Sequence, residues 1–289
     1  MIKRANCKIN IGLNILRRRD DGYHELETVI YPVVGLYDDV QVEAMASDKG
    51  APRVEFRVEG LEIDCAAEDN LCVRAARLMQ SRYGVGSVAI TLTKRIPFGA
   101  GLAGGSSDAT AVVLAMNEMF NIGATTQELI DIAAELGSDT AFFVCNTPQL
   151  CRGRGEIMSP IEVDLAGAWL VLVKPHNISV STREAYSGIS PDNSQPPLEE
   201  LLAQPIEQWQ TTMRNGFEPH IFRTYPPLLQ IKELLLSSGA SYAAMSGSGS
   251  TIYALFRDMS SEKMQQIFTQ ITNDDLLSQH PNDHYLLQL

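Results

Sequence analysis

The sequence has little positive charge and no long apolar run. Its 23 Lys and Arg residues face 35 Asp and Glu residues, which gives a net charge of −12 at pH 7. Because nucleic acids bind to basic surfaces, this charge balance argues against a nucleic-acid partner. The longest stretch of apolar and small residues near an expected strand, 166–173, is far shorter than the ~20 residues of a membrane helix. We therefore expect no membrane partner.

The sequence also lacks paired cysteines and a leader segment. It has five cysteines, an odd number, and no C-x-x-C pair, at Cys7, Cys65, Cys72, Cys145 and Cys151. This spacing argues against a disulfide scaffold and a structural zinc site, and favours small buried thiols in a reducing compartment. The first ten residues, MIKRANCKIN, lack the apolar segment of a secretory signal, so we expect a cytoplasmic protein.

A substantial core is expected, because 45% of the 289 residues are hydrophobic. The length fits one large domain or two smaller ones. From Cys7 to Ile15 every second residue is apolar, and the intervening positions are mostly polar, which predicts a half-buried strand. A turn follows at residues 19–22, where a glycine suits a positive φ.

The remaining pattern mixes strands and helices without regular alternation, which favours an α+β fold over a doubly wound sheet. Thr125 and Glu128 have the spacing of a capping box at the start of one helix. A polar, proline-bearing stretch at 187–210 predicts a connection with one short helix, and the tail from 272 to 289 carries no motif. The expected strands are 54–58, 88–92, 169–173, 242–245 and 251–256, and the expected helices are 71–79, 106–120, 126–135, 228–236 and 262–271.

The most informative segment reads P-F-G-A-G-L-A-G-G-S-S-D-A at 97–109. Small residues allow backbone amides to approach a ligand, and a helix start adds unpaired N–H groups, so the segment suits a phosphate chain. A flexible loop before a capped helix is the plainer interpretation. The segment contains a literal G-x-G-x-x-G but not in a strand–loop–helix setting, and the Walker A, H-R-D and D-F-G motifs are absent.

Four further features are weak when each is taken alone. Lys8 and Asn10 lie on the polar face of the first strand, where a lysine is usually solvated. The G-S-D-T segment at 137–140 could hold a catalytic aspartate or a helix cap. The S-G-S-G-S segment at 246–250 fits a tight hairpin or a second wall around phosphates. The D-G-Y-H segment at 21–24 could stack on an aromatic ligand or simply pack.

Together these segments resemble the GHMP kinases, named for galactokinase, homoserine kinase, mevalonate kinase and phosphomevalonate kinase. Residues 97–109 resemble the phosphate motif of that family, and 246–250 resemble its C-terminal glycine motif. Within the family, the segments at 5–10, 18–26, 68–78 and 137–143 resemble members that act on a cytidine diphosphate derivative of methylerythritol. The resemblance covers about residues 3–257.

This resemblance implies a two-domain α+β architecture. It has a ribosomal S5 domain 2-like N-terminal domain at 1–157, which binds ATP, and a ferredoxin-like C-terminal domain at 158–289. It implies that Lys8 and Asp139 form the catalytic pair, with ATP and Mg²⁺ as cofactors and Ser107 with water as the metal ligands. The residues implied for ATP are Asn70 near the adenine, and Pro97, Gly99, Ala100, Gly101, Leu102, Ala103, Gly104, Gly105, Ser106 and Ser107 around the phosphates.

For the substrate, the resemblance implies that Tyr23 and His24 grip the cytosine. Tyr186 would stack on the other face of the base, and Thr182 and Asn10 would lie nearby. The sequence departs from related loops at Ala100 and Ala103, which replace glycine and are expected to keep φ below zero. It also departs at 140–141, where Thr-Ala replaces Val-Pro and could shift the backbone after the catalytic aspartate.

The expected activity is ATP-dependent phosphorylation of the 2-hydroxyl of that small-molecule substrate, by a monomer or homodimer. Three alternatives stay open. The chain could phosphorylate another small alcohol, of the homoserine or mevalonate type. It could be a nicotinamide oxidoreductase that uses the literal G-x-G-x-x-G. It could also be a nucleotide-binding regulator without turnover, because a fold alone does not fix a function.

Overall fold

The computed structural model describes residues 1–46, 50–63, 65–278 and 281–289. The chain forms two compact units that do not follow the expected boundary at 157/158. Two long strands, β1 (Ile2–Arg18) and β2 (His24–Ala44), supply residues to both units, so neither unit is continuous in sequence. Unit 1 contains residues 1–8, 36–98 and 103–147, and unit 2 contains residues 9–35, 99–102 and 148–289.

β1 pairs with β2 after the predicted turn, in which Gly22 has a φ of +85° and donates its N–H to the Arg19 carbonyl. The prediction of a half-buried β1 is wrong, because every residue from Ala5 to Ile15 is buried. Both faces of this strand are covered. Lys8 is therefore a buried lysine and not a solvated one.

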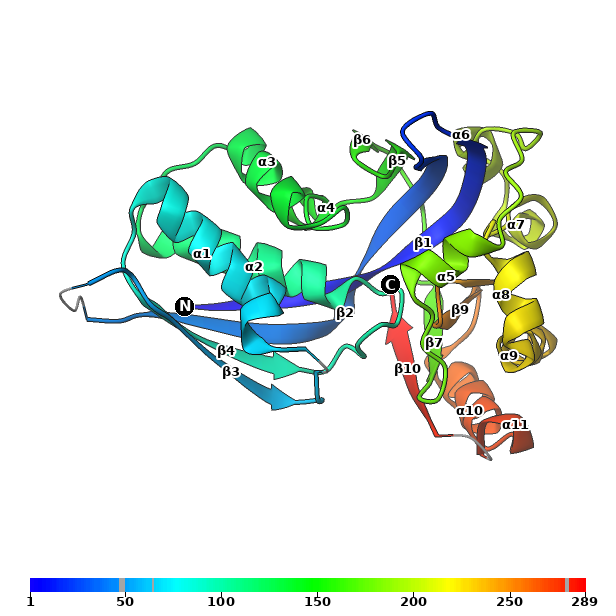
Figure 1. The fold of residues 1–289 in the computed structure, drawn as a ribbon. Coiled ribbons are helices and arrows are strands. Elements are labelled where there is room, and N and C mark those ends of the chain that lie inside the picture. Colours follow the sequence, from blue (N-terminus) through cyan, green and yellow to red (C-terminus); the bar gives the residue numbers. More distant parts are fainter. Residues whose placement is uncertain (47–49, 64, 279–280) are drawn as a thin grey trace. The chain divides into compact units, whose positions relative to one another are not determined.

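Unit 1 is built on β3 (Val54–Gly60), which runs parallel to β4 (Val88–Lys94), and on the end of β2, which runs antiparallel to β4. Apolar residues of β2 and β4 form one core with three helices that pack on one another (Figure 1). These helices are α1 (Leu71–Tyr83), α2 (Gly104–Met119) and α3 (Thr126–Leu136), accompanied by the short η1 (Ala67–Asp69) and α4 (Phe142–Cys145).

Two helices of unit 1 begin at side-chain caps, one of which was predicted. Asn70 caps α1 by accepting from the Cys72 amide, and the Thr125–Glu128 capping box begins α3. β4 alternates buried and half-buried positions, as its period of two predicted.

The nicotinamide oxidoreductase alternative loses its structural basis in unit 1. β4 ends ten residues before α2 begins, and the next described element after α2 is a helix, α3.

Unit 2 contains a four-stranded antiparallel sheet in the order β10-β7-β9-β8 (Figure 1). Helix α9 packs against β8 and β9. The start of β2 also pairs with β5. The elements are β5 (Gln149–Gly153), β6 (Ile157–Pro160), β7 (Trp169–Pro175), α5 (Thr182–Ser187), α6 (Leu198–Leu202), α7 (Ile206–Thr212), α8 (Glu218–Thr224), α9 (Pro226–Ser237), β8 (Tyr242–Met245), β9 (Ile252–Phe256), α10 (Ser261–Thr272), α11 (Asp275–Ser278) and β10 (Asn282–Gln288).

One expectation for unit 2 needs correction, because the segment 187–210 carries two short helices, α6 and α7, instead of one. The tail, for which the sequence predicted no element, contains β10, which pairs along the whole of β7. The α+β character of the fold is confirmed. Across the described ranges, no helix has the length and apolarity that a membrane crossing requires.

Candidate active site

The strongest chemical feature of unit 1 is an ion pair between Lys8 in β1 and Asp139 in the turn before α4. The Lys8 Nζ lies 3.8 Å from the Asp139 carboxylate. The Lys8 side chain is 4% exposed, whereas that of Asp139 is 40% exposed. A buried cation therefore stands behind a carboxylate that a ligand can reach. Such a pair can accept a proton at the carboxylate and stabilise negative charge nearby.

The turn that carries Asp139 is braced from within and from α2. The Thr140 hydroxyl donates to the Gly137 carbonyl at 2.7 Å and closes the turn. The Thr110 hydroxyl in α2 donates to the Thr140 carbonyl at 2.8 Å. Thr140 therefore contributes a hydrogen bond that fixes this turn.

The part of the glycine-rich loop in unit 1 forms the start of α2. The helix begins at Gly104, two residues before the predicted start, and no side chain caps it. The expectation of a negative φ at Ala103 is wrong, because Ala103 has a φ of +55° and takes the left-handed conformation that starts the helix. Ser106 is half-buried and Ser107 is buried, so Ser106 is the more accessible hydroxyl. The exposed Gly105 lies beside it.

The loop residues Gly99–Leu102 belong to unit 2, where they pack on the predicted C-terminal glycine motif. The Ser246 hydroxyl donates to the Gly101 carbonyl at 3.0 Å, and the Thr251 amide donates to the Ala100 carbonyl at 3.2 Å. Gly101 has a φ of +75°, and a Cβ there would lie 2.2 Å from the Ser246 carbonyl oxygen. The 246–250 segment is thus both the β8–β9 connection and a support for the loop.

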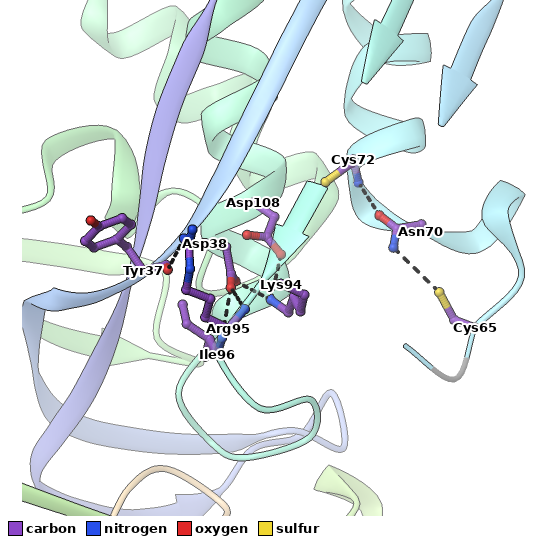
Figure 2. Close-up of polar contacts among 9 residues, drawn as sticks. All are labelled: Tyr37, Asp38, Cys65, Asn70, Cys72, Lys94, Arg95, Ile96 and Asp108. Atoms are coloured by element: carbon purple, nitrogen blue, oxygen red, sulfur yellow. Dashed lines mark hydrogen bonds and ion pairs between the residues drawn. The ribbon is translucent and has the colours of Figure 1, made fainter. Parts of the chain in front are cut away.

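Asn70 borders a cavity in unit 1. The cavity has a volume of about 460 Å³, and ten of the described residues line it. The Asn70 Oδ1 is occupied by the Cys72 amide at 2.9 Å, and its Nδ2 lies 3.7 Å from the Cys65 Sγ (Figure 2). The lining residues are Phe56, Val58, Glu59, Gly60, Leu61, Glu62, Ile63, Cys65, Ala67 and Asn70.

The expectation of buried cysteines is confirmed only for Cys7, Cys72 and Cys151, because Cys65 and Cys145 are exposed.

In unit 2, His24 and Tyr186 contact each other directly. Their rings stack with centroids 5.0 Å apart, and Phe217 contacts the Tyr186 ring edge-on. Tyr23, which is 57% exposed, has the Arg154 guanidinium 4.9 Å from its ring centroid. Tyr186 therefore stacks on His24, whereas the neighbour of Tyr23 is Arg154.

The other two predicted substrate residues differ in exposure. The Asn10 amide is buried and donates to the Thr28 hydroxyl at 3.0 Å. Thr182 is exposed at the start of α5. Burial, with a contribution from Arg18, lowers the pKa of His24 below its usual value. His24 is therefore a neutral ring near pH 7, which suits stacking and hydrogen bonding.

The sequence analysis missed a buried group of charges in unit 1 that comprises Asp38, Lys94 and Asp108 (Figure 2). Lys94 pairs with both carboxylates, and each of the three side chains is at most 2% exposed. A signal was present, because Lys94 continues the buried alternation of Val88, Ile90 and Leu92.

Two family models match this chain. The model for the GHMP kinases N terminal domain matches residues 70–147, and the model for the GHMP kinases C terminal matches residues 197–272. A 4-diphosphocytidyl-2-C-methyl-D-erythritol kinase of Bacteroides fragilis is 44% identical over 256 residues, which cover 89% of this chain and 92% of that protein.

Solved structures give the same picture. A crystal structure of 4-(cytidine 5'-diphospho)-2C-methyl-D-erythritol kinase matches with a TM-score of 0.81 and 29% identity, over 100% of both chains. A homoserine kinase from Cytophaga hutchinsonii matches with a TM-score of 0.66 and 20% identity, over 97% of this chain and 93% of that one. The second likeness shows a shared fold alone.

Proposed function

This chain belongs to the GHMP kinase family, and from that premise we propose that it transfers the γ-phosphoryl group of ATP to the 2-hydroxyl of 4-diphosphocytidyl-2-C-methyl-D-erythritol. The observation that carries the proposal is the Lys8–Asp139 pair, a buried ammonium 3.8 Å from a half-exposed carboxylate. The substrate assignment rests on the similarity to the Bacteroides fragilis enzyme, which extends over 89% of the chain.

The proposed reaction uses one proton acceptor and one charge stabiliser. Asp139 accepts the proton of the substrate hydroxyl, and the hydroxyl oxygen then forms a bond to the γ-phosphorus as the bond to the β-phosphate oxygen breaks. Lys8 pairs with the Asp139 carboxylate and stabilises the alkoxide that develops. Phosphoryl transfer otherwise depends on alignment and charge, which the protein supplies through fixed donors.

For ATP, the first turn of α2 offers backbone amides to the phosphates. It has no capping side chain to compete for these amides, and its dipole favours an anion. The cavity beside Asn70 has apolar walls from Phe56, Val58 and Ile63, which suit a purine ring.

Mg²⁺ supplies charge neutralisation on the phosphates when it binds with ATP. Across the described residues, no group of three or more potential metal-ligating side chains gathers. A magnesium ion carried on phosphates needs only one or two protein oxygens, and the half-buried Ser106 hydroxyl, with water, suits that role better than the buried Ser107.

For the cytosine, the aromatic residues of unit 2 offer stacking surfaces. Tyr186 is half-buried, and one face of its ring is covered by neutral His24. We infer that the base stacks on Tyr186 and hydrogen-bonds with His24, which moves aside to admit it. Binding energy from this remote part of the substrate would help to orient the 2-hydroxyl for attack.

The proposal is tested by measuring ADP formation with Mg²⁺, ATP and each of four alcohols. The alcohols are 4-diphosphocytidyl-2-C-methyl-D-erythritol, homoserine, mevalonate and galactose. We expect turnover with the cytidylyl substrate alone, and a fall in kcat of roughly 10²–10⁴-fold in Asp139→Asn and in Lys8→Met. The matched control is Lys3→Met, which removes an exposed lysine of the same strand that pairs with Glu118.

Three results would change the conclusion. Turnover with another alcohol would replace the substrate assignment. ATP binding without any turnover would favour a regulator. Full activity in Asp139→Asn would remove the catalytic assignment.

A further inference from the structure

Unit 1 buries three ionisable side chains where β4 ends and α2 begins, as Figure 2 shows. Lys94 Nζ donates to the Asp108 Oδ2 at 2.8 Å and to the Asp38 Oδ2 at a still shorter distance. Placing two carboxyl groups and one ammonium in the interior is costly, and apolar residues of similar volume often serve stability as well or better. The charges therefore call for an explanation beyond stability.

Asp38 controls the path of the chain as it leaves β4. Its Oδ1 accepts the backbone amides of Arg95 at 2.5 Å and Ile96 at 2.8 Å. These are the two residues directly before Pro97 and the glycine-rich loop. The other oxygen of Asp38 holds Lys94. One carboxylate thus fixes both the last residue of β4 and the first two residues beyond it.

Lys94 in turn sets the position of α2. A Cβ on Gly104 would lie 2.9 Å from the Lys94 Nζ and 2.9 Å from the Ile96 side chain, so the first turn of α2 rests directly on these two residues. Asp108, one turn further along α2, binds the same ammonium. The start of α2 has no capping side chain of its own, so this contact substitutes for a cap as its anchor.

We propose that Asp38, Lys94 and Asp108 are positioning residues that hold the first turn of α2 where its amides bind the phosphates of ATP. The inference rests on the proposed function in one respect, namely that ATP binds at this helix start. None of the three residues needs to touch ATP. Their effect is on the affinity for nucleotide and not on the phosphoryl transfer itself.

The two carboxyl groups are not equivalent. Asp108 has one buried oxygen, Oδ1, without a hydrogen-bond partner, and burial raises the pKa of Asp108 to about 8, against the opposing effect of Lys94. A neutral amide can therefore replace Asp108 with little loss. Asp38 accepts two backbone amides as well as Lys94, so the charge at Asp38 is the one that the arrangement needs.

The test compares Asp38→Asn with Asp108→Asn. We expect Asp38→Asn to raise the Kd for MgATP and the KM for ATP at least tenfold, while kcat at saturating ATP changes less than about threefold. Asp108→Asn should bind MgATP within about threefold of the wild type. The matched control is Glu27→Gln, because Glu27 is also a buried carboxylate that accepts a backbone amide, that of Leu198, and pairs with a cation, Arg152.

A charge-free variant separates positioning from stability. Asp38→Asn/Lys94→Met/Asp108→Leu keeps similar volumes without buried charges, so its melting temperature should stay near that of the wild type while ATP affinity falls at least tenfold. Wild-type ATP affinity in this variant, or equal losses in Asp38→Asn and Glu27→Gln, would overturn the proposal. If the triple variant does not fold, the comparison of Asp38→Asn with Glu27→Gln decides the proposal, with the melting temperature of each variant measured beside its Kd for MgATP.

These measurements also separate this inference from the proposed function. A wild-type protein that binds MgATP but phosphorylates none of the four alcohols would overturn the proposed reaction, and the Kd comparison would still decide the positioning role. A wild-type protein that does not bind MgATP would overturn both.

Discussion

Removing either partner of the Lys8–Asp139 pair should abolish most of the activity, but the two removals should affect stability in opposite directions. The reason is the difference in exposure, 4% for the Lys8 side chain and 40% for that of Asp139. Lys8→Met replaces a buried ammonium by an apolar group of similar length and leaves behind a carboxylate that water can reach. Asp139→Asn removes the negative charge that lies 3.8 Å from this buried ammonium.

The size of the effect follows from the separation of the charges. At 3.8 Å and an effective dielectric constant of about 20, Coulomb attraction is about 4 kcal/mol. Water around the half-exposed Asp139 reduces this attraction to about 2 kcal/mol. We therefore expect Asp139→Asn to lower the free energy of unfolding by about 2 kcal/mol. Lys8→Met should leave it unchanged or raise it slightly, because it removes a buried charge.

The assay combines urea unfolding with kcat measured at saturating ATP and substrate. The double variant Lys8→Met/Asp139→Asn should lose about as much kcat as either single variant, because residues that act on one proton transfer are not additive. Two results would refute the reasoning. One is a kcat loss in the double variant equal to the product of the single losses. The other is a marked destabilisation by Lys8→Met.

Three further predictions concern other parts of the candidate site. Gly101→Ala should lower the melting temperature and weaken MgATP binding at least tenfold, because the new Cβ would lie 2.2 Å from the Ser246 carbonyl oxygen. Unchanged affinity would contradict the close contact of Gly101 with Ser246. Because the pKa of His24 is lowered in the folded state, the unfolded chain binds more protons than the folded chain near and below pH 6.5. The free energy of unfolding should therefore fall as the pH drops through that value. In thermal melts from pH 5 to 8, His24→Gln should flatten this dependence. Tyr186→Leu should raise the KM for the cytidylyl substrate about tenfold without changing the KM for ATP, whereas Tyr186→Phe should behave as the wild type.

The elements that could be predicted from sequence are those whose signals are local. The strand at 88–92 has a clear period of two, and the helix after Thr125 has its capping box, so both were found within a few residues. β2 was not predicted as a continuous strand, because Pro32 and Gly35 interrupt its pattern. β10 begins with three polar residues, Asn282, Asp283 and His284, and it exists because β7 offers it an edge to pair with. Such pairing between distant segments has no local signal.

The candidate site shows the same division. Lys8, Asp139 and the glycine-rich loop stand in short motifs, so the sequence pointed to them before their contacts were known. Asp38 and Lys94 are 56 residues apart and belong to no motif. The sequence nevertheless marks them, because each falls in phase with the buried residues of its strand, Asp38 between Leu36 and Val40 and Lys94 after Leu92. A charge on the core face of a strand predicts a buried partner, although not which one.

Helix α2 shows why function and local stability conflict at this site. Two glycines open the helix, each costing about 1 kcal/mol relative to alanine, and the absence of a capping side chain costs about another 1 kcal/mol. A cap would occupy the amides that a phosphate needs, and a Cβ at Gly104 would meet Lys94. The first turn must therefore be held by tertiary contacts, from Lys94 to Asp108 and from Thr110 to the turn of Asp139. Because both contacts end on α2, the same helix that offers its amides to the phosphates also fixes the carboxylate that accepts the proton.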